Sequence, residues 1–216
     1  MSSDKPKKNI VKICKRLHKF GFLAAADGNV SCRVDDQTIL ITPSGVSKSN
    51  LHEEELCELR LDGEVLRGKP SSETQMHLAV YNNCPKAMSV VHAHPKIAVA
   101  WTIARPELKE LPSGALSELI LAVGAVPIAP YARPGSTEMG EVLLPFVKEH
   151  RVLLLARHGA LSWGENLQEA YMGIERLEHT AEVLKAAHDL GGITDLPDSE
   201  VEVLREMRKK MGPQTR

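Results

Sequence analysis

The sequence lacks three features that would place it in a specialised class of protein. Its four cysteines are far apart and form no C-x-x-C pair, which argues against a disulfide framework or a cysteine-based zinc site. They are Cys14, Cys32, Cys57 and Cys84. The formal net charge of −1 gives no bulk field that would attract nucleic acid or an anionic membrane. Any anionic ligand must therefore be bound by a local site.

Long apolar runs are also missing. The longest, such as Ile120–Pro130, are short and interrupted by Gly and Pro, so no segment is expected to span a bilayer. The charged N-terminus MSSDKPKKNIVK has no apolar stretch typical of a secretory signal, and scattered thiols fit a reducing compartment. We therefore expect a cytoplasmic protein with no membrane and no nucleic-acid partner.

Helix and strand patterns alternate along the chain without a linker-like stretch or an internal repeat. Helices are predicted at residues 9–20, 72–83, after Pro95, at 137–149 and 166–190, and a final short helix is predicted from Ser199. Strands are predicted at residues 30–34, 38–42, 56–61, 64–66, 88–93 and 152–156. The last is a continuous apolar run, which indicates a strand buried on both faces. The expected fold is a single three-layer α/β/α domain over residues 1–216, with a central mixed β-sheet. Its core covers about residues 8–190, and a C-terminal helical segment covers 191–216.

Two histidines in the segment VVHAHP, His92 and His94, are two residues apart on a predicted strand. Side chains at that spacing point to the same face, so both imidazoles can bind one cation. His158 follows the predicted strand 152–156, and ligand sites of α/β sheets collect at strand ends. Three neutral histidines with an open position form a common catalytic Zn²⁺ shell, although imidazole also suits other divalent transition metals. The spacing alone leaves open that these are hydrogen-bonded core histidines. Gly159 is expected to permit a tight turn.

Three segments offer the hydroxyl and backbone N–H groups that bind a phosphate. They are a turn, a strand end and the predicted start of a helix, where the macrodipole favours an anion. Their residues are Gly28, Asn29, Ser44, Gly45, Ser71 and Ser72. Each segment is also explained as an ordinary turn or cap, with Ser72 and Gln75 as a capping pair. They indicate a phosphate site only if the fold brings them together.

Glu73 lies in the first turn of the same predicted helix. A Glu there commonly stabilises the helix dipole, but one that faces a metal can act as a general base. It would remove a carbon-bound proton beside a metal-held carbonyl group, and the metal would stabilise the resulting enediolate. His77, four residues later on the same helix face, can orient this carboxylate or serve a structural role.

Six short motifs, taken in their order along the chain, resemble the zinc-dependent class II aldolase family. That family includes L-fuculose-1-phosphate aldolase, L-ribulose-5-phosphate 4-epimerase and methylthioribulose-1-phosphate dehydratase. The resemblance covers about residues 8–190, and although each motif is weak alone, the set in order is a strong signal. The motifs are GNVS (28–31), ITPSG (41–45), KPSSE (69–73), HAHP (92–95), APYA (129–132) and RHGALSWGENLQEA (157–170).

The resemblance implies a role for each residue singled out above. His92, His94 and His158 match the metal ligands, and the six phosphate-segment residues match the phosphate cradle. Glu73 matches the acid/base carboxylate, which can approach the metal when no substrate is bound. The implied reaction cleaves the C3–C4 bond of an L-ketose 1-phosphate through a zinc-stabilised enediolate, giving dihydroxyacetone phosphate and an aldehyde. The resemblance also implies a homotetramer with active sites near subunit interfaces.

Departures from the family pattern leave the substrate open. The fuculose-phosphate aldolases carry a tyrosine, donated by a neighbouring subunit, in a segment that aligns near Leu116–Glu118, and this chain has none there. Ser117 or Glu118 can replace it, or its role is absent. Tyr131 is retained at a different family position, and Pro134 replaces an aromatic residue near the aldehyde pocket. The segment 191–216, which often shapes the aldehyde end, shows no usable match.

Other activities therefore remain open. The motif Ser71–Thr74 is intermediate between aldolases and dehydratases, so dehydration of methylthioribulose 1-phosphate is an alternative. Aldol cleavage of a deoxy or methylthio pentulose 1-phosphate is another, favoured by the missing tyrosine. A sugar-phosphate 4-epimerase is less well supported, because epimerases usually carry Asp in place of Glu73. A non-catalytic module like the adducin head is least supported, because all three histidines are present.

Overall fold

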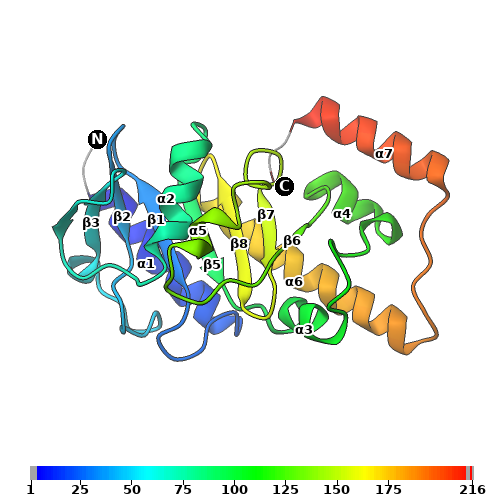
Figure 1. Cartoon of the computed structure of the whole chain (residues 1–216), viewed down its shortest axis with the longest axis horizontal. Helices are drawn as coiled ribbons and strands as arrows, with labels where there is room; N and C mark the ends of the chain where they lie inside the picture. Colours follow the sequence, from blue (N-terminus) through cyan, green and yellow to red (C-terminus); the bar gives the residue numbers. More distant parts are fainter. Residues whose placement is uncertain (1–3, 213–214, 216) are drawn as a thin grey trace.

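In the computed structural model, residues 4–212 and 215 are described, and they form an eight-stranded sheet with helices on both faces (Figure 1). The strand order is β4-β3-β2-β1-β5-β8-β7-β6. β6 and β7 are parallel and all other neighbours are antiparallel, so the predicted mixed sheet is confirmed. The strands are β1 (Asn29–Arg33), β2 (Thr38–Ile41), β3 (Cys57–Arg60), β4 (Val65–Arg67), β5 (Ser89–Ala93), β6 (Ile128–Ala129), β7 (Val152–Leu155) and β8 (Gly159–Gly164).

Helices cover the two faces of this sheet unequally (Figure 1). Side chains of α1, α3, α4 and α6 form one apolar core, and those of α2 and α5 help to form the other. On β7, Leu154 packs into the first core while Leu153 and Leu155 pack into the second, which confirms the predicted doubly buried strand. The helices are α1 (Asp4–Lys19), α2 (Thr74–Asn83), α3 (Lys96–Ala104), α4 (Ser117–Ala122), α5 (Glu138–Glu141), α6 (Leu167–Asp189) and α7 (Asp198–Met211). Two short 3₁₀ helices cover Glu53–Glu55 and Ser113–Ala115.

Two predicted helices differ in length from the observed ones. The helix expected at 137–149 is wrong beyond Glu141, where α5 ends and turns continue. Pro145 explains this, because it lacks an N–H group and disfavours a helical conformation at the residue before it. The last helix, expected to be short, is α7 with 14 residues. Of the helices that the described residues form, none combines the length and apolar composition needed to cross a bilayer.

The start of α2 also differs from the prediction. Its N-cap is Glu73, and the predicted capping pair of Ser72 and Gln75 is wrong because the helix begins one residue later and its N-cap has no side-chain hydrogen bond. Ser71 acts here instead: its Oγ accepts a hydrogen bond of 3.3 Å from the Glu73 backbone N–H, and its carbonyl accepts one of 2.6 Å from the Thr74 hydroxyl. The loop before α2 is therefore fixed by Ser71, which leaves the Ser72 side chain in solvent.

Candidate metal centre and phosphate pocket

The middle of the sheet brings the three predicted metal ligands together. β5 lies between β1 and β8, and His92 on β5 is paired with Asn29 on one side and Leu161 on the other. His94 follows β5, and His158 precedes β8. One nitrogen atom of each of the three histidines lies within 4.8 Å of the others. The structure therefore brings His158 close to His92 and His94, as its position at the end of a predicted strand had indicated.

The protonation of the two neighbouring imidazoles fits a shared cation. His92 Nδ1 lies 2.9 Å from the Ala160 carbonyl oxygen, so it must carry the proton and leave a lone pair on Nε2. His94 Nδ1 faces the Asp27 carboxylate at 3.6 Å, which favours the same tautomer. The two Nε2 atoms are 3.0 Å apart, where facing lone pairs repel unless a cation lies between them. Burial lowers the pKa of both histidines and keeps them neutral, as metal ligands must be.

The turn that carries His158 is made differently from the prediction. The residue in the left-handed region is Arg157, with φ of 59°, and its backbone N–H donates to Thr102 Oγ1 at 2.8 Å. Gly159 is required for space instead. An added Cβ would lie 2.6 Å from the Ala93 carbonyl oxygen and 2.8 Å from ring carbons of His92 and His94. The absence of a side chain at 159 thus permits β8 to approach the histidines.

Glu73 faces the three histidines from the start of α2. Its carboxylate oxygens lie 3.0 Å from His158 Nε2 and 3.3 Å from His92 Nε2. Asn29 Nδ2 donates a hydrogen bond of 2.8 Å to the same carboxylate. Burial alone would raise the pKa of Glu73, but the hydrogen bonds from His158 and from the Asn29 amide outweigh it and lower this pKa. The carboxylate is therefore ionised and directed at the candidate metal position.

A buried chain of hydrogen bonds orients Asn29. Its Oδ1 accepts from His77 Nε2 at 2.5 Å, since its Nδ2 already donates to Glu73 and to Ser71 Oγ. His77 Nδ1 must then accept from Ser31 Oγ, at 2.6 Å, and Ser31 Oγ lies 2.8 Å from the Tyr81 hydroxyl. His77 thus acts on Glu73 through Asn29. Helix spacing in the sequence predicted that His77 lies near this carboxylate. It did not predict that Asn29 connects the two side chains.

All six predicted phosphate-cradle residues line one polar cavity of about 150 Å³. Two backbone hydrogen bonds bring their loops together: Ser44 N–H to the Lys69 carbonyl at 3.0 Å, and Ser71 N–H to the Thr42 carbonyl at 3.2 Å. Glu73 and His94 also line this cavity, which joins it to the candidate metal centre. Two further charged residues that were not predicted from the sequence, Asp27 and Lys48, also line this cavity.

The residues proposed to replace the family tyrosine lie elsewhere. Ser117 and Glu118 begin α4 and are exposed, and neither lines the phosphate cavity. Tyr131 is 57% exposed, so its ring is also available to solvent. Within this chain, the structure does not bring the predicted substitutes to the histidines.

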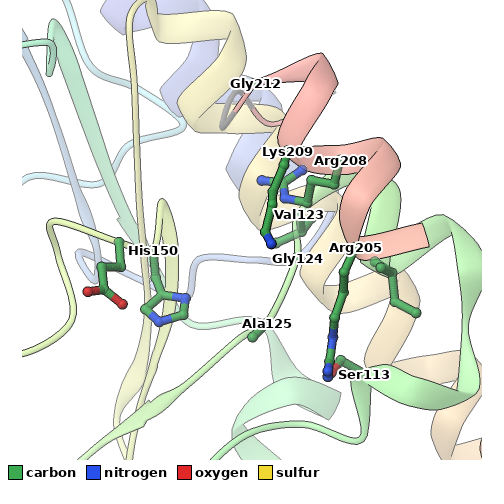
Figure 2. A pocket seen from close by; sticks show the side chains of 11 residues that line it. Ser113, Val123, Gly124, Ala125, His150, Arg205, Arg208, Lys209 and Gly212 are labelled. Atoms are coloured by element: carbon green, nitrogen blue, oxygen red, sulfur yellow. The ribbon is translucent and has the colours of Figure 1, made fainter. Parts of the chain in front are cut away.

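A second and larger cavity, of about 390 Å³, lies between α4 and α7 (Figure 2). Basic side chains of α7 face His150 across it. Two of them have protein partners: Arg208 donates to the Leu121 carbonyl at 2.8 Å, and Lys209 pairs with Glu206. The cavity holds no set of histidines and carboxylates comparable to the first among its lining residues.

The chain belongs to the family described as "Class II Aldolase and Adducin N-terminal domain", whose sequence profile matches residues 8–184. It is 34% identical to the 3-oxo-tetronate 4-phosphate decarboxylase of Haemophilus influenzae, over 94% of this chain and 97% of that protein. It is 33% identical to the L-fuculose phosphate aldolase of Methanococcus vannielii, over 82% of this chain and 93% of that protein. A solved structure of L-fuculose 1-phosphate aldolase matches with a TM-score of 0.86 at 30% identity, covering 97% and 98%.

These similarities confirm the predicted family, the fold and the assignment as an enzyme. The relatives' names contain two activities, aldolase and decarboxylase. Decarboxylation was not among the reactions considered from the sequence.

Proposed function

We propose that this protein is a metal-dependent lyase acting on a small phosphorylated sugar or sugar acid, and that it breaks the carbon–carbon bond on the far side of the carbon adjacent to the carbonyl group. The observation that carries the proposal is the position of Glu73, whose carboxylate lies 3.0 Å from His158 and 3.3 Å from His92 beside a polar cavity. His92, His94 and His158 would hold the metal, with Zn²⁺ as the first choice for three imidazoles. The six cradle residues would bind the phosphate.

When bound, the metal supplies Lewis-acid polarisation of the substrate carbonyl oxygen. Glu73 moves the proton at the adjacent carbon, because its ionised carboxylate faces the position next to the three imidazoles. Asn29 has one Nδ2 group that donates both to Glu73 and to Ser71 of the cradle. The proton-transfer group and the phosphate pocket are therefore held at a fixed separation.

The first candidate reaction is cleavage of an L-ketose 1-phosphate to dihydroxyacetone phosphate and an aldehyde. The C3–C4 bond breaks, its electron pair remains on C3 as an enediolate, and the C4 hydroxyl gives its proton to a base as it becomes the carbonyl of the aldehyde. The Glu73 carboxylate, protonated from that base or from solvent, then delivers a proton to C3 and completes dihydroxyacetone phosphate. This candidate is supported by the relatives named as aldolases, which align over most of this chain.

The second candidate is decarboxylation of a phosphorylated 3-oxo sugar acid. The relative with that activity in its name aligns over 94% of this chain. Decarboxylation breaks the bond to the carboxylate, leaves the electron pair on the enediolate carbon, and ends with protonation of that carbon. It needs no group to remove a hydroxyl proton from the departing fragment. The absence of a tyrosine at 116–118 therefore favours this candidate.

Two product assays on one metal-analysed preparation test the proposal. Dihydroxyacetone phosphate would be measured across a panel of ketose 1-phosphates, and CO₂ across phosphorylated 3-oxo acids. The panel would include methylthioribulose 1-phosphate, for which water loss reports the dehydratase alternative. Production of dihydroxyacetone phosphate supports the first candidate, and CO₂ release supports the second. Water loss or epimerisation alone would reject the carbon–carbon lyase.

We also propose that the working protein is a homotetramer in the cytoplasm, with active sites near subunit interfaces. The family resemblance supports this assembly, and it would provide a source for the group that this chain lacks near its own histidines. Light scattering of the metal-loaded protein tests it. A monomer with full activity would reject the assembly but leave the proposed chemistry unaffected.

A further inference from the structure

Lys48 is a buried lysine that the proposed chemistry does not yet use. It is 1% exposed and is among the largest fully buried side chains of the described residues. Its Nζ donates to the backbone carbonyls of Ala26, at 2.7 Å, and Val46, at 2.9 Å. Both acceptors are neutral. Burying an ammonium group is costly unless an opposite charge compensates for it.

The carboxylates near Lys48 leave its positive charge available to an anionic ligand. Burial lowers the pKa of its ammonium group, while the carboxylates of Asp27 and Glu73 oppose that change. These carboxylates have other partners: Glu73 contacts His92 and His158, and Asp27 faces His94. The hydrogen bonds of the ammonium itself go to the two carbonyls.

Lys48 lines the same cavity of about 150 Å³ as the six cradle residues. The cradle consists of backbone amides, hydroxyls and one carboxamide, all of which are neutral donors. A phosphate monoester carries between one and a half and two negative charges at neutral pH. Of the described residues lining this cavity, Lys48 is the lysine or arginine that can balance this charge.

Its two hydrogen bonds also place Lys48 between two walls of the cavity. Ala26 precedes the turn that contains Gly28, and Val46 follows Gly45. Gly28 and Gly45 both have positive φ, of 68° and 74°, so each wall has a backbone conformation that favours glycine. One ammonium group thus joins the two glycine turns of the cradle.

We propose that Lys48 is a positioning residue for the phosphate group: it supplies the positive charge beneath the cradle and holds its two glycine turns together. This rests on the proposed function, since it assigns the charge balance of the proposed phosphate pocket. The substrate class it selects is a phosphate dianion in preference to a neutral or singly charged group.

Inorganic phosphate is the probe that tests this. Calorimetric titration at constant ionic strength would compare metal-loaded wild type, Lys48→Met and Lys185→Met. Lys48→Met keeps the aliphatic chain and removes the charge. Lys185→Met removes the same charge from the exposed end of α6, where Lys185 pairs with Asp189. Lys48→Met should bind phosphate about 10- to 100-fold more weakly, and Lys185→Met should bind within twofold of wild type.

If Lys48 only held the two glycine turns together and did not balance the phosphate charge, the result would differ. In that case Lys48→Met would unfold at lower temperature but bind phosphate as wild type does, which would overturn the proposal. The pH dependence adds a second readout: wild-type affinity should rise between pH 6 and 8 as phosphate becomes a dianion, and this rise should be smaller in Lys48→Met. If Lys48→Met does not fold, Lys48→Gln takes its place, because its amide can still donate to one loop carbonyl.

The outcome also separates this inference from the proposed function. Unchanged binding in a folded Lys48 variant would reject the role of Lys48 and leave the phosphate pocket in place. Failure of wild type itself to bind phosphate would reject both the pocket and the lysine's role in it. Weaker binding in the Lys48 variant, with unchanged metal content, would support both.

Discussion

The phosphate-cradle cavity and the α4–α7 cavity of this protein differ in how they are built. The α4–α7 cavity is the larger, at about 390 Å³ against about 150 Å³, but its basic residues lie on one surface helix. The smaller cavity receives side chains from separate loops and strands, and several of them hydrogen-bond to one another. For this reason the proposed function rests on the smaller cavity, where distant segments meet in buried hydrogen bonds, and not on the larger one.

Loss of the metal should give the largest effect. His94→Ala, or treatment with a strong chelator, should lower kcat/KM by at least about 10³-fold, because the Lewis acid contributes several kcal/mol to the transition state. Metal content and activity would be measured together, with His179→Ala on the exposed face of α6 as the control. Full metal occupancy in His94→Ala would remove this residue from the metal centre.

Glu73→Gln should give the next largest effect. The amide keeps the size and one hydrogen-bond acceptor, so the metal should remain, but proton transfer is lost. Turnover should fall by about 10²–10³-fold. Metal analysis of the same preparation is the control. Normal turnover would show that another group moves the proton.

Protonation of His77 in acid should lower the free energy of unfolding by an intermediate amount. Burial lowers the pKa of His77 from 6.5 to about 4. The unfolded chain therefore takes up this proton near pH 6.5, but the folded chain does so only near pH 4, so stability falls as pH decreases through that window. The expected loss is about 3 kcal/mol at its completion.

Urea unfolding at pH 7 and pH 4.5 measures this effect in wild type and His77→Gln. The variant should lose less stability than wild type over the same range, since other titrating groups are common to both. An equal loss in the two proteins would show that His77 is not the group responsible.

Changes in the α4–α7 cavity should have the smallest effect. Arg205→Gln should leave kcat/KM within about twofold, because surface charge changes away from buried partners are usually small. The assay is the one used for Glu73→Gln. A loss of more than tenfold would reverse the comparison and make the larger cavity part of the working site.

Periodicity predicted those parts of the site that depend on regular structure. His92 and His94 share a strand face, and the buried run 152–156 located the strand that precedes His158. The sheet order, with β5 between β1 and β8, then brings distant segments together, and no local pattern specifies that order. The assignments of Glu73 and the phosphate cradle came from the family resemblance and from cap chemistry.

What the sequence could not provide depends on tertiary contacts. Lys48 reads as an ordinary surface lysine, and only the approach of two loops buries its ammonium group. Arginine is not a residue type that favours a positive φ, yet Arg157 adopts one in the β7–β8 turn. The early end of α5, in contrast, could have been predicted from Pro145.

Asn29 has a consequence for how mutations at this site combine. One carboxamide donates to Ser71 in the phosphate cradle and to Glu73 at the histidines, while accepting from His77. Binding energy gained at the phosphate end can therefore be used to align the carboxylate at the reacting end. We therefore expect the two ends to be thermodynamically coupled, so that changes on either side of Asn29 are non-additive in a double-mutant cycle. A substrate analogue without its phosphate would then lose turnover as well as affinity.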